Sequence, residues 1–353
     1  MSFREVIVVL TVWFFSNDGY TQVSERIPLK INIPDLQMNQ AKTQFIATSN
    51  LIDAALNSLN SINGLVKKEN YRNKITSFNN PANAEMGFSL ENEIRFAMKP
   101  ILDKTKNTNT KKFSDIISLL LNSPVKNQLP VKIYGPGTIF SSLLSFVGNL
   151  AIHEKKITRE DVDTFVLTIG KYFAQYEKLK EANNTFDANI DKFNIKLQEL
   201  QFDIREFMLD LVNIIYTHTN RSDLRLKSLE EILLKYLDES LIATALEESS
   251  VDIKRRKIYY PGDGIKTAKE IVYGIQKLFN EYQKLYAQNY SEIKAVLLQT
   301  KELGKHINTR QVDQAILEFD LLYKESKDAD ILNLRLTTLS ERLKYLVSTE
   351  SIK

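Results

Sequence analysis

Cysteine is absent from this chain, and histidine occurs only 3 times in 353 residues. Without a thiol the protein has no disulfide, no cysteine nucleophile and no thiolate-bound metal. An excess of charge of one sign is also lacking, because 47 basic side chains stand against 44 acidic ones. A nearly balanced chain gives no electrostatic reason to expect nucleic acid as a partner.

Motifs that carry chemistry are missing as well. The stretch GDGIKT (262–267) has Ile265 where a phosphate-binding loop needs glycine directly before its lysine. A metalloprotease helix would carry a second histidine four residues after His153, and none is there. His218 and His306 stand in polar stretches at expected helix ends, where an imidazole can cap main-chain carbonyls. We therefore expect no enzymatic activity, no cofactor and no bound metal ion.

The N-terminus carries the clearest signal that is present. Arg4 precedes the apolar run VIVVLTVWFF (6–15), and small and polar residues follow up to Thr21. A basic start, a short apolar run and a small-residue exit are typical of a secretory signal peptide. The run is shorter than the roughly 20 residues that span a bilayer. We expect export to the periplasm or the medium, with Gln22 first after cleavage; the alternative is a buried N-terminal strand.

The rest of the chain is rich in helical periodicity. A 3-4 repeat extends from Val162 to Ile214, and its two core positions are apolar or aromatic except at Asn183. The first position comprises Val162, Ile169, Tyr176, Asn183, Ile190, Leu197, Ile204 and Leu211, and the second comprises Phe165, Tyr172, Leu179, Phe186, Phe193, Leu200, Phe207 and Ile214. Such a repeat predicts one long helix that packs sideways against others.

Further apolar stripes predict helices over 45–66, 266–307 and 312–346. Helices of this length suit an elongated molecule, and the many phenylalanines of the repeat favour antiparallel packing over a parallel, leucine-rich dimer. The expected fold class is all-α, an elongated bundle of long antiparallel helices with coiled-coil-like packing. Alternating apolar residues in IPLKINIP (27–34) add the option of a minor patch of short strands.

Two landmarks recur along the chain. KIYGPG (132–137) is nearly repeated as KIYYPG (257–262), and FAQYEKLKEAN (173–183) shares Phe, Tyr, Lys, Leu and Asn with FNEYQKLYAQN (279–289) at the same spacing. We interpret this as a degenerate internal duplication. Each copy is expected to make a short extended arm and a Pro-Gly turn that starts a long helix.

This interpretation divides the chain into five segments. They are a signal peptide (1–21), an extended N-terminal arm (22–40), an N-terminal helical region (41–130) and two long-helix copies (131–220 and 221–353). The shared asparagine of each copy, Asn183 or Asn289, falls in the seam of its helix. A buried amide in such a seam typically fixes helix register at some cost in stability. We expect both amides to be buried and hydrogen-bonded.

Candidate interaction residues come from the same motifs. The basic run KRRK (254–257) beside two tyrosines can grip a phosphate group or an anionic headgroup, although such a run is more often a solvated loop. The candidate interaction residues are Tyr134, Pro136, Gly137, Arg255, Arg256, Tyr259 and Tyr260. The expected partner is a protein, with a membrane as the alternative.

The segment 137–152, GTIFSSLLSFVGNLAI, has no charged residue. A helix that is uncharged all round is either fully buried or membrane-seeking, and this one is too short for a single span. Its candidate membrane-seeking residues are Ile139, Phe140, Leu143, Leu144, Phe146 and Val147. Long helices that carry a small apolar tongue resemble, in architecture, the α-helical pore-forming toxins, whose soluble forms hide such a tongue.

Two functional hypotheses follow from these observations. The first is an exported, non-enzymatic helical protein that acts through protein–protein interaction or envelope assembly. The second, implied by the resemblance, is a membrane-active, pore-forming protein that uses the segment 137–152. Burial of this segment among several helices favours the first hypothesis, and exposure at one tip of the molecule favours the second.

Overall fold

The computed structural model describes residues 33–81, 83–121, 136–216, 218–248, 259–304, 306–327 and 330–350. Every regular element in these residues is an α-helix, so the predicted all-α class is confirmed. The helices are α1 (Ile33–Val66), α2 (Glu69–Phe78), α3 (Leu90–Leu102), α4 (Asn107–Leu121), α5 (Pro136–His153), α6 (Arg159–Ile215), α7 (Arg221–Arg225), α8 (Leu229–Tyr236), α9 (Glu239–Glu248), α11 (Gly264–Thr300), α12 (Thr309–Lys327) and α13 (Asp330–Ser348).

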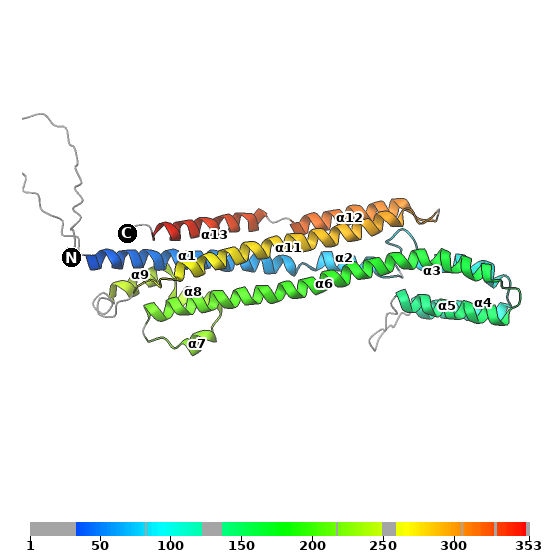
Figure 1. Ribbon diagram of the computed structural model, residues 1–353, viewed down its shortest axis with the longest axis horizontal. Helices are drawn as coiled ribbons and strands as arrows, with labels where there is room; N and C mark the ends of the chain where they lie inside the picture. Colours follow the sequence, from blue (N-terminus) through cyan, green and yellow to red (C-terminus); the bar gives the residue numbers. More distant parts are fainter. Residues whose placement is uncertain are drawn as a thin grey trace, which may run out of the picture.

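Four long helical columns run along an elongated molecule (Figure 1). In chain order they are α1 with α2, then α6, then α11, and finally α12 with α13. Neighbouring columns run in opposite directions. Lys171 of α6 donates to the carbonyl of Leu303, whereas Lys196, further along α6, pairs with Glu281 of α11. The predicted bundle of long antiparallel helices is therefore confirmed for the described residues.

The last column closes the bundle against the first. α12 returns along α11, because Lys294 of α11 pairs with Asp320 of α12 at 2.9 Å. α13 then lies against α1, where the guanidinium of Arg335 donates to the carbonyl of Asn57 at 2.6 Å. α1 and α11 also contact each other and α6, and the apolar side chains between the columns form one continuous core.

The local sequence explains the length of α6. At its start Thr158 and Asp161 form a capping box, in which each side chain accepts a hydrogen bond from the main-chain N–H of the other. No proline interrupts the 57 residues that follow, and the predicted apolar stripe is buried along most of them. At about 1.5 Å per residue the helix is about 85 Å long. The single helix predicted over 162–214 is confirmed.

Shorter helices are mounted at the two ends of α6 (Figure 1). α3, α4 and α5 form one end, where the rings of Phe88 and Phe140 lie 5.0 Å from those of Tyr172 and Phe173 of α6. α7, α8 and α9 lie at the other end, together with the beginning of α1 and the end of α13. We call these two ends of the rod the head and the terminal end.

The prediction of an extended arm over 22–40 is wrong from Ile33 onward, because α1 begins at that residue. Pro34 suits the first turn of a helix, because the N–H that proline lacks would have no partner there. Residues 22–32, with most of the predicted strand 27–34, lie outside the described residues. No strand occurs among the residues that the structure describes, so the minor strand patch is not found in them.

The helix predicted over 266–307 ends at Thr300. Hydrogen bonds from each residue to the third residue before it tighten the chain after this point. The connection to α12 is held by Gly87, whose carbonyl accepts from Asn308 N at 2.7 Å. Gly87 has φ +80°, and a Cβ built on it would lie 2.4 Å from Val312 Cγ2. Only glycine fits at this point, where the connection between α2 and α3 crosses the connection between α11 and α12.

Candidate functional site

The seam asparagines do not share one environment. Asn289 is 2% exposed, and its Nδ2 donates to the carbonyl of Ala182 at 3.1 Å. Its Oδ1 accepts from the hydroxyl of Tyr71 at 2.9 Å. Asn183, in contrast, is only half-buried and donates to Asp187 of its own helix at 3.4 Å. The predicted burial is therefore confirmed for Asn289 and wrong for Asn183.

The physical reason for the difference is the set of side chains that covers each amide. Tyr176 and Ile190 hold the same heptad position one repeat before and one repeat after Asn183, and both are buried, so the repeat itself stays in register with the core. At the level of Asn289 it is Ala182 that is buried, and the next residue, Asn183, is only half-buried. The amide of Asn183 therefore bonds within its own helix, whereas that of Asn289 is covered by Tyr71.

The two Pro-Gly motifs begin different kinds of helix. Tyr134, Arg255 and Arg256 lie outside the described residues, as do the Lys-Ile pairs of both motifs. Pro136 is the first residue of α5, a helix of 18 residues, and not of a long column. The second motif ends in a turn, closed by a hydrogen bond from Gly264 N to the carbonyl of Pro261 at 2.9 Å, and α11 follows directly. The predicted turn before a long helix is confirmed for the second motif and wrong for the first.

Tyr260 of the second motif packs inside the protein. Its hydroxyl lies 2.7 Å from Thr48 Oγ1 of α1, and its ring meets that of Phe45 edge-on at 5.4 Å. Burial raises the pKa of this hydroxyl to about 12. A Cβ on Gly264 would lie 2.8 Å from the Tyr260 ring, so glycine at the start of α11 leaves room for it. Tyr260 therefore ties α1 to α11, and Tyr259, 52% exposed, is the neighbour that is free to contact a partner.

The two motifs also lie far apart. A Cβ on Gly137, which is exposed, would lie 3.4 Å from Glu177 of α6. Pro261 and Gly264 share a cleft with Asp210 of α6. Roughly thirty residues of α6 separate Glu177 from Asp210, which corresponds to about 50 Å. The candidate interaction residues therefore do not form a single site.

The uncharged segment 137–152 forms most of α5 and is amphipathic in the bundle. The side chains of Ile139, Leu143 and Val147 are buried against the core, and Phe140, Leu144 and Phe146 are partly buried against it. The ring of Phe146 lies 5.9 Å from that of Phe113 of α4. The outer face of α5 includes small polar residues such as Ser141, Ser145 and Asn149. None of the described helices is both long and apolar enough to cross a membrane.

A cleft that the sequence did not single out lies where α11 begins against α6. It has a volume of about 330 Å³ and is lined on its apolar part by Leu200, Phe207, Pro261 and Ile271. The acidic residues that line it are Asp203, Glu206, Asp210, Asp263 and Glu270. On each helix these residues have the spacing of an ordinary solvated face. Only the pairing of α6 with α11 brings them together.

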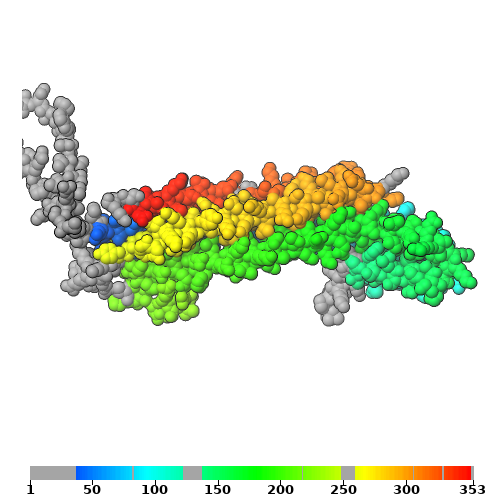
Figure 2. All heavy atoms as spheres, in the orientation of Figure 1, coloured from blue at the N-terminus to red at the C-terminus, as the bar shows by residue number. Residues whose placement is uncertain are grey.

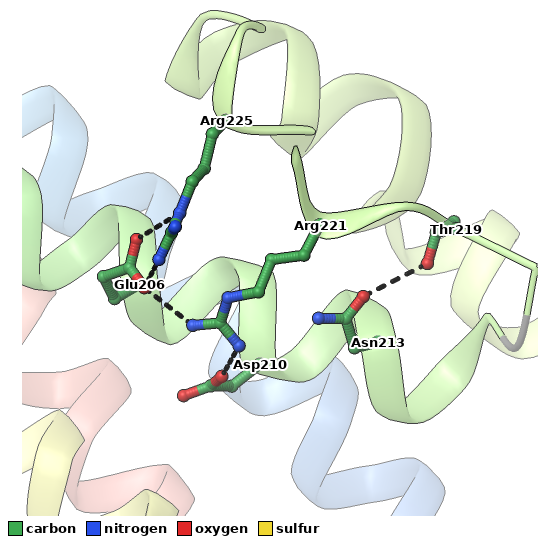
Figure 3. Close-up of polar contacts among 6 residues, drawn as sticks. All are labelled: Glu206, Asp210, Asn213, Thr219, Arg221 and Arg225. Carbon is green, nitrogen blue, oxygen red and sulfur yellow. Dashed lines mark hydrogen bonds and ion pairs between the residues drawn. The ribbon is translucent and has the colours of Figure 1, made fainter. Parts of the chain in front are cut away.

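Two arginines from the α7 segment hold the carboxylates at this cleft (Figure 3). Glu206 Oε2 accepts from Arg221 at 2.7 Å and from Arg225 at 2.9 Å. Arg221 also donates to Asp210 at 2.5 Å. The hydrogen bonds from Arg225 and Arg221 hold the pKa of Glu206 below its usual range. The carboxylate therefore stays ionised at neutral pH and serves as an anchor for α7.

At Glu206 this geometry offers a fixed negative charge. A general acid needs a carboxyl group with a raised pKa, and the shift at Glu206 has the opposite direction. In the part of the chain that the structure describes, no three His, Cys, Asp or Glu side chains are grouped so that they could hold a metal ion. Comparison of the chain with protein-family models, with curated proteins and with solved structures gives no match in any of the three.

Proposed function

We propose that this chain is an exported, non-enzymatic helical rod that acts by binding a protein partner through its terminal end, as a secreted protein or as part of an envelope assembly. The observation that carries the proposal is the exposure of large apolar side chains on the α7–α9 segment. Leu226 is 88% exposed, Leu234 70% and Leu241 40%. Leu226 directly follows α7, Leu234 lies on α8 and Leu241 on α9, and apolar surface left exposed on one segment is the kind that a protein partner covers.

These leucines are carried by well-anchored helices. Arg205 of α6 donates to the carbonyl of Lys227 at 2.6 Å, and Ser49 of α1 donates to the carbonyl of Leu237. Lys42 of α1 pairs with Glu247 of α9 at 2.5 Å. A surface on fixed elements binds with a smaller loss of conformational entropy than a loop does. The α7–α9 segment is therefore suited to present a preformed contact surface.

The pore-forming alternative has less support. Its proposed tongue, residues 137–152, keeps the apolar side chains of α5 packed on α6 and α4. Releasing them would expose apolar surface at a cost of about 25 cal/mol per Å². Liposomes loaded with a dye test the alternative directly: release of the dye by the purified protein would favour it over the proposal.

Site-specific photo-crosslinking in the native host tests the proposed function. A photoreactive residue at Leu234 is expected to yield one discrete adduct, with the same partner protein in repeated experiments. Leu317 on α12 is the matched control, because it is 61% exposed but lies on the shaft. Equal adducts at both positions, or none at Leu234 in cells and medium, would contradict the proposal. N-terminal sequencing of the recovered protein tests export, for which Gln22 is the expected first residue.

A further inference from the structure

The head of the rod ends in two connections that lie side by side. One is the turn between α3 and α4, and the other joins α5 to α6. Lys104 of the first connection donates to both carboxylate oxygens of Asp161 in the first turn of α6, at 2.7 and 2.6 Å. Asn109 of α4 donates to Glu154, directly after α5, at 3.0 Å. These contacts brace the two connections against each other.

The braced connections, together with the second turn of α4, present a group of lysines without partners, which we call the basic tip. The basic tip consists of Lys106, Lys111, Lys112, Lys155 and Lys156. All five residues are exposed, and none of their ammonium groups makes an ion pair or hydrogen bond with another described residue. The tip belongs to the part of the head that extends beyond the end of the α11–α12 pair (Figure 2).

The acidic side chains near the basic tip are mostly occupied by other partners. Asp161 is bound by Lys104 and Glu154 by Asn109. Asp103 lies 3.8 Å from Lys99, and Asp163 lies 3.8 Å from Arg159. Glu160, at the start of α6, and Asp115, one turn after Lys111 on α4, are exposed, and neither has such a partner within the described residues. The five lysines therefore leave an excess of positive charge at this end.

An apolar side chain accompanies the lysines. Ile152, in the last turn of α5, is 76% exposed and stands within a few residues of Lys155 and Lys156. We propose that the basic tip docks on the surface of an anionic lipid membrane, with its lysines at the headgroups and Ile152 at the boundary of the acyl chains. Docking of this kind requires no helix that crosses the bilayer.

Electrostatics favours a lipid surface as the partner. Clusters of about four to eight basic residues are typical of proteins that bind anionic lipid, and each lysine near such a surface strengthens binding about fivefold. A planar array of headgroups can meet lysines from two connections and from the start of α4 at once, and it also accommodates an exposed isoleucine. The proposal does not rest on the proposed function, which concerns the α7–α9 segment at the other end of the rod.

Vesicle co-sedimentation with the protein recovered from its host tests the proposal. The probes are vesicles of phosphatidylcholine alone and vesicles in which about a third of the lipid is phosphatidylglycerol. The protein is expected to bind only the anionic vesicles and to be released at about 1 M salt, where charges are screened beyond about 3 Å. Equal binding to both kinds of vesicle, or binding to neither, would overturn the proposal.

Two variants of equal charge locate the contact. Changing the five lysines of the basic tip to glutamine is expected to weaken binding at least about tenfold. The matched control changes five exposed shaft lysines without ion pairs to glutamine, and binding is expected to stay within about twofold, since these lie away from the bilayer. The shaft lysines are Lys269, Lys277, Lys284, Lys324 and Lys344. An equal loss of vesicle binding in both variants would show a general effect of net charge and would refute the basic tip as the contact site.

Two further measurements complete the test. Ile152→Ser is expected to weaken binding several-fold while the helical circular dichroism stays unchanged, because the side chain is exposed in the free protein. An unchanged affinity would remove Ile152 from the contact. Heparin in solution serves as a soluble polyanion: if it binds the basic tip while anionic vesicles do not, the partner is a polyanion and the lipid assignment is overturned.

Discussion

Asn289 of α11 donates a hydrogen bond from its Nδ2 to the main-chain oxygen of Ala182 of α6 at 3.1 Å. The same amide accepts from the hydroxyl of Tyr71 in α2 at 2.9 Å. One buried side chain thus joins three columns of the bundle. A shift of α11 along α6 by one residue would break the contact with Ala182, so the amide favours a single register of the two helices.

Replacing Asn289 by leucine is expected to destabilise the protein by about 2 to 3 kcal/mol, because the Tyr71 hydroxyl would remain buried without a partner. The free energy of unfolding in urea measures the effect. Asn289→Leu combined with Tyr71→Phe should recover part of the loss, because the unpaired hydroxyl is then absent. Recovery would not occur if the two side chains acted independently.

Asn183→Leu is the matched control for this prediction. Asn183 is half-buried and contacts only its own helix, through Asp187 at 3.4 Å. The change is expected to stay within about 0.5 kcal/mol, as surface substitutions usually do. Equal losses for Asn183→Leu and Asn289→Leu would contradict the difference in burial between the two asparagines.

Gly87→Ala is expected to destabilise the protein by more than about 1 kcal/mol, because its positive φ strains any side chain. The added methyl would also lie 2.4 Å from Val312 Cγ2 and 2.8 Å from the carbonyl oxygen of Asn308. Gly64→Ala on α1 is the control: no atom lies within 4 Å of the added methyl, and alanine in a helix is expected to stabilise by about 1 kcal/mol. Thermal unfolding, monitored by circular dichroism, compares the two variants. A Gly87→Ala variant more stable than the unchanged protein would refute the close contact of Gly87 with Val312 and Asn308.

The long columns could be predicted because periodicity is a local property of the sequence. Tyr176 and Tyr282 hold the same position in the two recurring landmarks, and both are buried. The asparagines at the end of the same landmarks differ, because the burial of an edge position depends on which helix covers it. Asn289 is covered by Tyr71, a residue more than two hundred positions away.

The cleft between α6 and α11 and the basic tip could not be predicted, for the same physical reason. Arg221 meets Glu206, and Lys104 meets Asp161, only after separate helices have packed together. A single helix face shows no sign of these contacts, since charged residues are ordinary on solvated faces. Predicting them from the sequence would have required the order and direction of the columns.

Tyr260→Phe is expected to change how the protein responds to alkaline pH. Burial raises the pKa of the Tyr260 hydroxyl from 10.0 to about 12 in the folded state. The folded protein therefore holds this proton more tightly, so the hydroxyl contributes stability below pH 10 that is lost as the pH rises toward 12. The free energy of unfolding in urea is expected to be higher for the unchanged protein than for Tyr260→Phe below pH 10, and this difference should shrink between pH 10 and 12. A constant difference from pH 8 to 12 would contradict the buried hydroxyl.

Asp161→Asn is expected to weaken the start of α6 at neutral pH and to have a much smaller effect near pH 2. Hydrogen bonds from Lys104, and then from Thr158, hold the pKa of Asp161 at about 2, below its ordinary 3.8. A lowered pKa in the folded state contributes stability above pH 3.8 that is lost as the pH falls toward 2. The difference in melting temperature between the two proteins should therefore be constant from pH 5 to 7 and shrink steadily as the pH falls from 3.8 to 2.

Asp163→Asn is the control for Asp161→Asn, because the carboxylate of Asp163 is mostly exposed and lies 3.8 Å from Arg159. Its effect on the melting temperature is expected to be small at every pH, as for other exposed ion pairs. Lys104→Gln should reproduce part of the loss seen with Asp161→Asn, and the double variant should lose less than the sum of the two, since both changes remove the same contact. Strict additivity would mean that Lys104 and Asp161 do not interact, and the brace between the two connections of the head would then have to rest on Asn109 and Glu154 alone.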